Sequence, residues 1–528
     1  MDELAKHKNQ VDTENKGKRA VIFGLLASGA ALIYSLYWFS VCDTRTFLVM
    51  ALVGSLVIGV IAYCHVKGLF ARRERRVCVF ASILSLSCIV FVFAFPPMTV
   101  PDEAHHFFAS YWLADVIAGQ ASLNDSEFPV RDEDFDLYQK SDTIISADSY
   151  THIFNHFKWG ETSTGNTVVR EFDFSFGSEN VITKVGTVIA ILLGRALRLG
   201  VYPLFYLGRL FNCILFIVGA VAAYRITPVG KNVIAACSLL PMTLHLAASY
   251  SYDAGIIALS FVSIALLFRS ICRKDQISWQ ECAQIAACAF LLAPCKVIYV
   301  LVFFLVFLIP RDRFASKRQT IMFRIGVFLL MLVSLLLVRL PSIGVIAIEG
   351  NGLDYRGEES GHFYSIVSLL LNPVATATMF FRTFATLGDF YWTTVLGGSL
   401  GWFQENIKAP YSVMVVYVGL IIIASLQSQD DSIRFSAAQR ILFAAIAIIA
   451  FLGAMFTMAI GWTFDTENIV MGVQGRYLLP VLPLLLCSIR PKTLAFQGSP
   501  FSVCISAISM VNVVYLIRIV AIALSSTV

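Results

Sequence analysis

The residues best suited to chemistry follow an apolar segment that ends at a pair of prolines. The sequence PPMTVPDEAHHFF places two adjacent carboxylates, Asp102 and Glu103, before His105 and His106. A carboxylate held at the edge of a membrane could remove the proton of a hydroxyl that attacks a lipid-linked substrate. Alternatively, the carboxylates cap the run 104–118, which is expected to form an amphipathic helix along the outer surface. The sequence leaves both interpretations open.

Two cationic side chains could bind a phosphate group. Arg476 lies in the sequence QGRYLLP, where its guanidinium could donate paired hydrogen bonds to phosphate and Tyr477 could line the same site. An arginine that snorkels to the membrane interface would have the same sequence. Lys296 and Tyr299 lie in the apolar run APCKVIYVLVFF, where an unpaired ammonium would be costly. We therefore expect Lys296 to contact a carboxylate or a phosphate.

Four further polar residues are expected to contribute to substrate binding. Arg209 and Asn212 are three residues apart, so they share one face of a helix and should point into the protein interior. Asp253 follows the short turn SYSY, where it could equally cap the next helix. Asp389 lies in LGDFYW, whose aromatic side chains could stack on a sugar or form an interfacial belt.

A metal site is a further possibility. His152 and His156 are four residues apart and, together with Asp102 and Glu103, could bind a divalent metal such as Mg²⁺ or Mn²⁺. No matching ligand motif follows the histidines, so the sequence does not establish a metal requirement. The 12 cysteines form no Cys-x-x-Cys pair, and none lies in the segment 96–182. A zinc motif and a disulfide framework in that segment are therefore not expected.

The composition sets the class of protein in which these residues must be positioned. Of 528 residues, 57% are hydrophobic and 14% are charged, against roughly 25% charged in soluble proteins. The mean hydropathy is +0.74. These values exclude a soluble enzyme, a disordered scaffold and a nucleic-acid binder. The sequence predicts an all-α integral membrane protein.

About 11–13 apolar segments are long enough to cross a bilayer, which takes roughly 20 residues. Two more apolar segments, 185–199 and 366–387, are interrupted and are expected to lie on the membrane or dip into it. The predicted spans are 20–41, 47–64, 77–95, 204–224, 233–249, 254–270, 280–294, 297–309, 321–340, 411–426, 441–460, 477–489 and 501–524.

Lysine and arginine set the expected orientation. They are concentrated in the N-terminal tail and in the loops after the second, sixth and eighth spans, which places these segments and the N-terminus in the cytoplasm. The segment 96–182 then lies outside, with fifteen acidic against four basic residues, a net charge of −11. The predicted division is a cytoplasmic tail (1–19), three spans (20–95), an outer loop (96–203) and a bundle (204–528) with outer loops near 349–410 and 461–476.

Six short motifs together make the chain resemble a known family. They are PDEAH at 101–105, GRLFN at 208–212, LPM at 240–242 with SYD at 251–253, KVIY at 296–299, LGD at 387–389 and GRYLLP at 475–480. In this order, the motifs are similar to those of a bacterial family of large predicted membrane proteins. That family is catalogued as a domain of unknown function and is distantly similar to the GT-C glycosyltransferases.

The resemblance implies a fold, a location and a reaction. The fold would be a GT-C-like bundle with a large first outer loop that contains amphipathic helices, in the bacterial plasma membrane. The donor would be a sugar on a polyprenyl phosphate, and the acceptor an envelope glycan or glycolipid. Asp102, or else Glu103, would be the general base, with Arg476, Lys296 and Arg209 available to stabilise the leaving phosphate. A single displacement would invert the anomeric centre.

Two other classes of function compete with the enzyme. A transporter or flippase of a lipid-linked sugar should place charged residues near the middle of its spans, whereas most charges here lie at span ends or in loops. A polymerising or non-catalytic envelope-assembly protein would also use outer arginines and histidines, so the sequence separates that class poorly.

Overall fold

The computed structural model describes most of the chain, and its architecture is that of an all-α integral membrane protein, as the composition predicts. The one sheet among the described residues is a two-stranded antiparallel pair, β1 (Glu127–Arg131) and β2 (Thr167–Glu171). The described residues are 44–122, 127–141, 143–162, 167–171, 180–349, 362–428, 431, 433–490, 494–496 and 499–525.

Six described helices are long and apolar enough to cross a membrane. The expected first span, 20–41, lies outside the described residues, as does the N-terminal tail. The six are η1 (Arg73–Arg75) with α3 (Arg76–Ala94), α8 (Val201–Ile226), α11 (Asp253–Cys272), the first part of α13 (Lys317–Glu349), α17 (Ala437–Trp462) and α19 (Pro500–Ser525). Shorter apolar stretches are residues Gly54–Val66 of α2 (Thr44–Val66), η3 (Val297–Leu308), α16 (Tyr411–Ser425) and η6 (Gly475–Val481) with α18 (Leu482–Ser488).

Three apolar segments form broken helices, of which one, 233–249, was predicted as a single span. The segment 233–249 divides into α9 (Lys231–Leu239) and α10 (Pro241–Ala247), because proline lacks an N–H and disfavours helical geometry in the residue before it. The segment 280–309 divides into α12 (Trp279–Leu292) and the 3-10 helix η3. The interrupted segment 366–387 divides into α14 (Ile366–Leu371) and α15 (Pro373–Leu396). All three breaks occur at or beside a proline, namely Pro241, Pro294 and Pro373.

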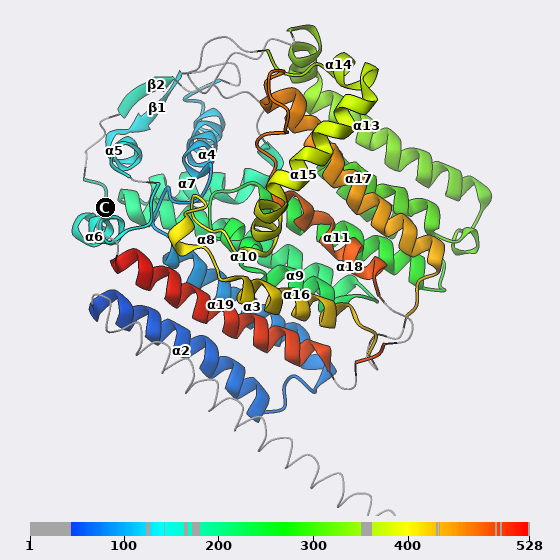
Figure 1. Ribbon diagram of the computed structural model, residues 1–528, viewed down its shortest axis with the longest axis horizontal. Coiled ribbons are helices and arrows are strands. Elements are labelled where there is room, and N and C mark those ends of the chain that lie inside the picture. Colours follow the sequence, from blue (N-terminus) through cyan, green and yellow to red (C-terminus); the bar gives the residue numbers. More distant parts are fainter. Residues whose placement is uncertain are drawn as a thin grey trace, which may run out of the picture.

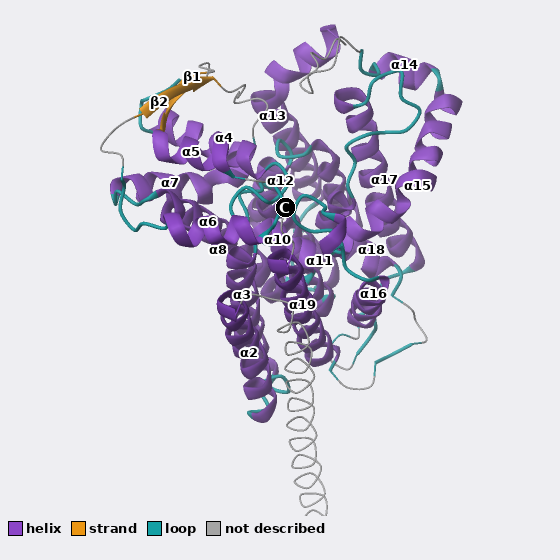
Figure 2. Ribbon diagram, turned by 60° about the vertical axis from the view of Figure 1, so that its left-hand side comes forward, coloured by secondary structure: helices purple, strands orange, loops and turns teal. Residues whose placement is uncertain are grey.

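The large loop after α3 folds into a cap at one end of the bundle. It contains α4 (Glu103–Ile117), α5 (Asp132–Lys140), α6 (Ala147–His156), the β1–β2 pair, η2 (Val181–Lys184) and α7 (Val185–Ala196). Figure 2 shows this cap on the upper left of the bundle, with α14, α15 and α17 on the opposite side. In Figure 1, α8 to α11 occupy the middle of the molecule.

The sequence predicted an amphipathic helix on the outer surface after Asp102, and the predicted surface position was wrong. A helix forms there, α4, but eleven of its fifteen residues are buried. The buried residues of α4 include Phe107, Phe108, Tyr111 and Trp112, and α7 packs against the helix at Ser110, whose hydroxyl lies 2.8 Å from that of Thr187. The helices with narrow buried faces are instead α5 and α6.

The close packing of α8 on α11 holds the middle of the bundle together. A Cβ atom added at Gly219 in α8 would lie 2.7 Å from the Cβ of Ala258 in α11. Small residues at such a crossing allow two backbones to approach closely inside a membrane. The two helices can therefore pack only while position 219 stays small.

We expect Gly219→Val to lower the yield of folded protein severalfold, because the added atoms force α8 and α11 apart. Fluorescence-detected size-exclusion chromatography of detergent extracts measures that yield. Gly326→Val in α13 is the matched control, since a Cβ there meets no described atom within 4 Å. Equal yields for the two variants would contradict the packing assignment.

Candidate functional site

Four of the predicted site residues lie at or next to the first residue of a helix, and all four lie at the same end of the bundle. Asp102 precedes α4, Asp253 is the first residue of α11, Lys296 precedes η3, and Arg476 is the second residue of η6. The opposite ends of α3, α11 and η3 carry arginines. Because successive elements run in opposite directions, residues far apart in the sequence meet at this end.

Arg476 is the centre of this cluster. Its NH2 donates to Oδ2 of Asp102 at 3.3 Å, and its Nε lies 3.5 Å from Oδ2 of Asp253. The Arg476 side chain is 6% exposed, whereas that of Asp102 is 50% exposed. The buried Nε has no hydrogen-bond partner among the described residues. The guanidinium therefore has donor capacity left over.

Gly475 explains how Arg476 is positioned. A Cβ atom at this residue would lie 1.9 Å from the carbonyl oxygen of Tyr391 in α15, so only glycine allows this approach. The amide of Gly475 donates to Oγ1 of Thr394 at 2.8 Å. Helix α15 thus fixes the start of η6 and, with it, the guanidinium.

Lys296 forms the second cationic part of the cluster. Its Nζ lies 3.5 Å from Oδ1 of Asp253 and 3.8 Å from the centre of the Tyr477 ring. Burial by itself would lower the pKa of Lys296, but Asp253 and the neighbouring tyrosines raise it above its usual range, so the ammonium stays charged. The expectation that Lys296 contacts a carboxylate is confirmed. Tyr299 fixes the backbone of Tyr477, because its hydroxyl donates a hydrogen bond to the carbonyl oxygen of Tyr477 at 2.7 Å.

The two histidines after the carboxylates have different surroundings. His106 is buried, and its ring meets that of Tyr252 edge-on at 4.7 Å. Burial, followed by the charges of Lys184, His105, Arg476 and Lys296, holds the pKa of His106 well below its usual range. This imidazole is therefore neutral at pH 7, and its Nδ1 has no hydrogen-bond partner among the described residues. His105 is exposed at the start of α4.

Glu103 and Arg209 form a separate, closed ion pair. Both side chains are 0% exposed, with NH2 and Nε of Arg209 donating to the two carboxylate oxygens at 2.6 and 2.8 Å. Arg209 also donates to the carbonyl oxygens of Val92, Phe95 and Pro96. The hypotheses that Glu103 is an alternative base and that Arg209 binds substrate do not fit this geometry, because neither group reaches solvent.

Asn212 has a positioning role in the same region. Its Nδ2 donates to the carbonyl oxygens of Ser249 and Ser251, at 2.7 and 3.0 Å. These bonds fix the turn that leads into α11 and so place Asp253. The prediction of direct substrate contact is not what the geometry indicates, since Asn212 is buried behind the cluster.

The two interpretations of Asp102 can now be separated. Asp102 occupies the N-cap position of α4, but its side chain makes no capping hydrogen bond. Its backbone is left-handed, with φ of 60°, a conformation that asparagine and aspartate tolerate better than most residues. The carboxylate is directed instead to Arg476. A cap alone therefore does not account for this residue.

Two other predicted groups lie outside the cluster. Asp389 in α15 accepts from the Tyr411 hydroxyl at 2.6 Å and from Nζ of Lys408 at 3.3 Å. The predicted metal group of His152, His156, Asp102 and Glu103 does not form, because Glu103 is bound to Arg209. Among the described residues no three His, Cys, Asp or Glu side chains are grouped to hold a metal.

Sequence reasoning missed two residues of the cluster. Lys184, at the end of η2, is 1% exposed and lowers the pKa of His106. Tyr252 packs between His106 and Lys296. The available signal for Lys184 was its position directly before the apolar segment 185–199, but nothing in the sequence connects it to α4.

We expect Glu103→Gln to destabilise the protein by about 3–5 kcal/mol, because it leaves the Arg209 charge buried without a counter-ion. Heating detergent extracts and measuring the soluble monomer gives the shift in the midpoint of thermal unfolding. Asp389→Asn is the control, since it removes a carboxylate that is 47% exposed. If both variants melted like the wild type, the ion pair would not be structural.

The matches to known proteins are limited to one family. The family model described as "Predicted membrane protein (DUF2142)" matches residues 84–485, which include the whole cluster from Asp102 to Tyr477. No curated protein and no solved structure matches the chain. The similarity to GT-C glycosyltransferases therefore stays a prediction. Since the match covers most of the 528 residues, the chain belongs to this family of predicted membrane proteins.

Proposed function

We propose that the protein is a membrane glycosyltransferase of the bacterial plasma membrane. It transfers a sugar from a polyprenyl-phosphate donor to a hydroxyl of an envelope glycan or glycolipid on the outer face. The observation that carries the proposal is the juxtaposition of a half-exposed carboxylate, Asp102, with the buried cations Arg476 and Lys296. Such a site offers a base to one substrate and an anion site to the other.

Asp102 fits the role of general base. The carboxylate is open to solvent on one side, and its contact with Arg476 is a long 3.3 Å, so an acceptor hydroxyl has room to approach. As the acceptor oxygen bonds to the anomeric carbon, its proton passes to Asp102. The bond from that carbon to the phosphate oxygen breaks in the same step, which inverts the anomeric centre.

The cations fit the other half of the reaction. The leaving lipid phosphate gains negative charge as its bond to the sugar breaks, and pre-positioned donors lower that barrier. Arg476 has a buried Nε without a hydrogen-bond partner among the described residues, and Lys296 is held charged beside it. Asp253 keeps both cations in place at about equal distances of 3.5 Å.

The location of the cluster suits a lipid-linked donor. The arginine-rich ends of the spans would face the cytoplasm, which puts the cluster at the outer boundary of the membrane. Helix α15, whose later part contacts Gly475 through Tyr391 and Thr394, presents exposed apolar side chains nearer its start, including Val374 and Phe381 at 79% and 74% exposure. A polyprenyl chain could lie against this face while its phosphate reaches Arg476.

We expect Asp102→Asn to lower transfer at least about 100-fold, because it keeps the shape and removes the base. A deletion strain, complemented at matched membrane levels, would be analysed for the sugars and linkages of its envelope glycans. Asp389→Asn is the matched control, since its carboxylate has a similar exposure at 47% but lies outside the cluster. Full restoration of the glycan by Asp102→Asn would overturn the enzyme and favour a transporter or assembly protein.

We expect Arg476→Lys to lower turnover at least tenfold, because an ammonium keeps the charge but loses the paired donors of the guanidinium. Initial rates at several concentrations of purified polyprenyl-phosphate sugar measure this effect. Arg382→Lys, on the exposed side of α15, is the control. A rate curve identical to that of the wild type would remove Arg476 from the donor site.

A further inference from the structure

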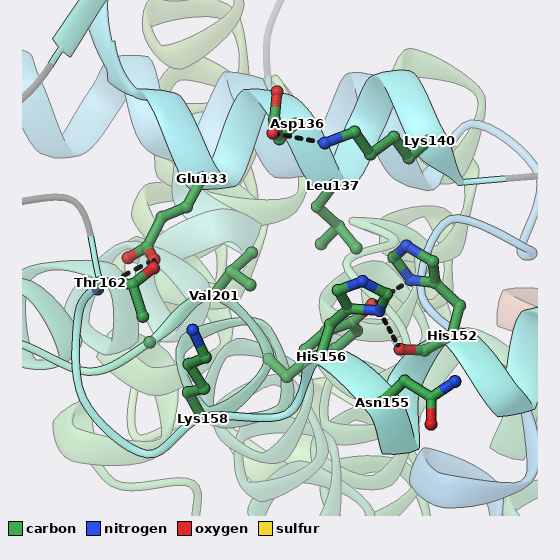
Figure 3. Close-up of a pocket in the computed structure, with 12 residues that line it drawn as sticks. Glu133, Asp136, Leu137, Lys140, His152, Asn155, His156, Lys158, Thr162 and Val201 are labelled. Carbon is green, nitrogen blue, oxygen red and sulfur yellow. Dashed lines mark hydrogen bonds and ion pairs between the residues drawn. The ribbon is translucent and has the colours of Figure 1, made fainter.

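A groove on the cap is distinct from the cluster around Arg476. It consists of two adjoining cavities, of about 260 and 330 Å³, that share Leu137, Lys140, His152 and Tyr202. Figure 3 shows the first cavity between α5 on one side and the end of α6 on the other. Each cavity approaches the size typical of small-molecule sites, roughly 300 Å³.

The charges that line the groove are unusual for the cap. The segment 96–182 has a net charge of −11 and four basic residues, yet two of these four, Lys140 and Lys158, line the first cavity. Asp136 pairs with Lys140 on the same helix, α5, at 2.6 Å, and Glu133 accepts from the Thr162 hydroxyl at 2.8 Å, while Lys158 lies on the opposite wall (Figure 3). Cations, carboxylates and the Asn155 amide together offer both donors and acceptors. A lining of this kind suits a ligand with many hydroxyls better than a simple anion.

Aromatic rings accompany these polar groups. Tyr202 lines both cavities and its hydroxyl lies 2.6 Å from Nδ1 of His152, whose ring stacks on His156 at 4.2 Å. Phe157 stacks on Tyr202 at 6.5 Å and contacts Trp159, which is 74% exposed. Flat rings beside hydrogen-bonding groups present an apolar surface together with polar tips, the combination that binds sugar rings.

The second cavity reaches the segment of chain that precedes the candidate base. Pro96 and Pro97 line the second cavity, and the chain continues from them through the turn that ends at Asp102. The Tyr150 hydroxyl of α6 donates to the carbonyl oxygen of Ala94 at 2.6 Å, which fastens the cap to the end of α3. A short segment of chain therefore joins the lining of the second cavity to Asp102.

We propose that this groove binds the saccharide of the acceptor, with sugar residues further from the reacting hydroxyl lying between α5 and α6. The inference rests on the proposed glycosyltransferase function and names its second substrate as an oligosaccharide. Lys158 and Asn155, which line the first cavity, hydrogen-bond to sugar hydroxyls, and the exposed ring of Trp159, which lines neither cavity but follows Lys158 in the chain, stacks on a sugar ring at the edge of the groove.

The test uses the full chain in lipid nanodiscs. The probe is the oligosaccharide pool released by mild acid from envelopes of a strain that lacks the protein, because this pool contains acceptors that have not been modified. Saturation-transfer NMR and titration measure binding. We expect Asn155→Ala and Lys158→Ala each to weaken binding about tenfold, a change of about 1.4 kcal/mol. Lys274→Ala, an exposed lysine in the loop after α11, should bind like the wild type.

Asp102→Asn separates this inference from the proposed function. Asp102 is not part of the groove lining. The variant should therefore bind the oligosaccharides like the wild type while failing to modify them. If Asp102→Asn restored the glycan but the groove variants still lost binding, the base assignment would fail and the saccharide site would stand. Undetectable binding by the wild type, or unchanged binding by both groove variants with intact thermal unfolding, would overturn the site.

Discussion

The buried ion pair between Glu103 and Arg209 is the interaction on which the candidate site depends. It joins the first turn of α4 to α8, and the guanidinium also gathers the carbonyl oxygens at the end of α3. Glu103 in turn accepts from the amide of Met98, within the turn between the two helices. Without this pair, that turn would have no fixed shape, and a charge buried in the bundle would lack its counter-ion.

The pair also decides the role of the neighbouring carboxylate. Because Glu103 points inward, the adjacent Asp102 takes a left-handed backbone and stays half exposed, directed to Arg476. The two adjacent acidic residues thus have opposite environments. Glu103 accepts short hydrogen bonds from Arg209, whereas Asp102 accepts a longer one from Arg476. The same contrast holds for the arginines, since Arg209 is fully bonded while Nε of Arg476 has no hydrogen-bond partner among the described residues. Spare hydrogen-bonding capacity, more than charge, distinguishes the residues suited to substrates.

The cap and the bundle make different contributions. The bundle supplies Asp253, Lys296 and Arg476 from the ends of elements that are distant in sequence, and it exposes apolar side chains on α15. The cap supplies Asp102 and, further out, a groove with mixed polar and aromatic walls. A donor that stays in the membrane and an acceptor that lies above it could therefore meet at Asp102.

The sequence by itself determined the class of protein, most of its helices and the segments that form the cluster. Apolar runs that are long enough to span a bilayer define helices such as α8 and α11. An isolated charge at the end of such a run is costly without a partner, and this cost predicted the carboxylate contact of Lys296. Only the tertiary structure decided the partners themselves. The sequence could not show which of Asp102 and Glu103 is buried, nor that Arg209 closes on Glu103. Burial and long-range ion pairing depend on which distant elements pack together. Local spacing and composition do not specify that packing.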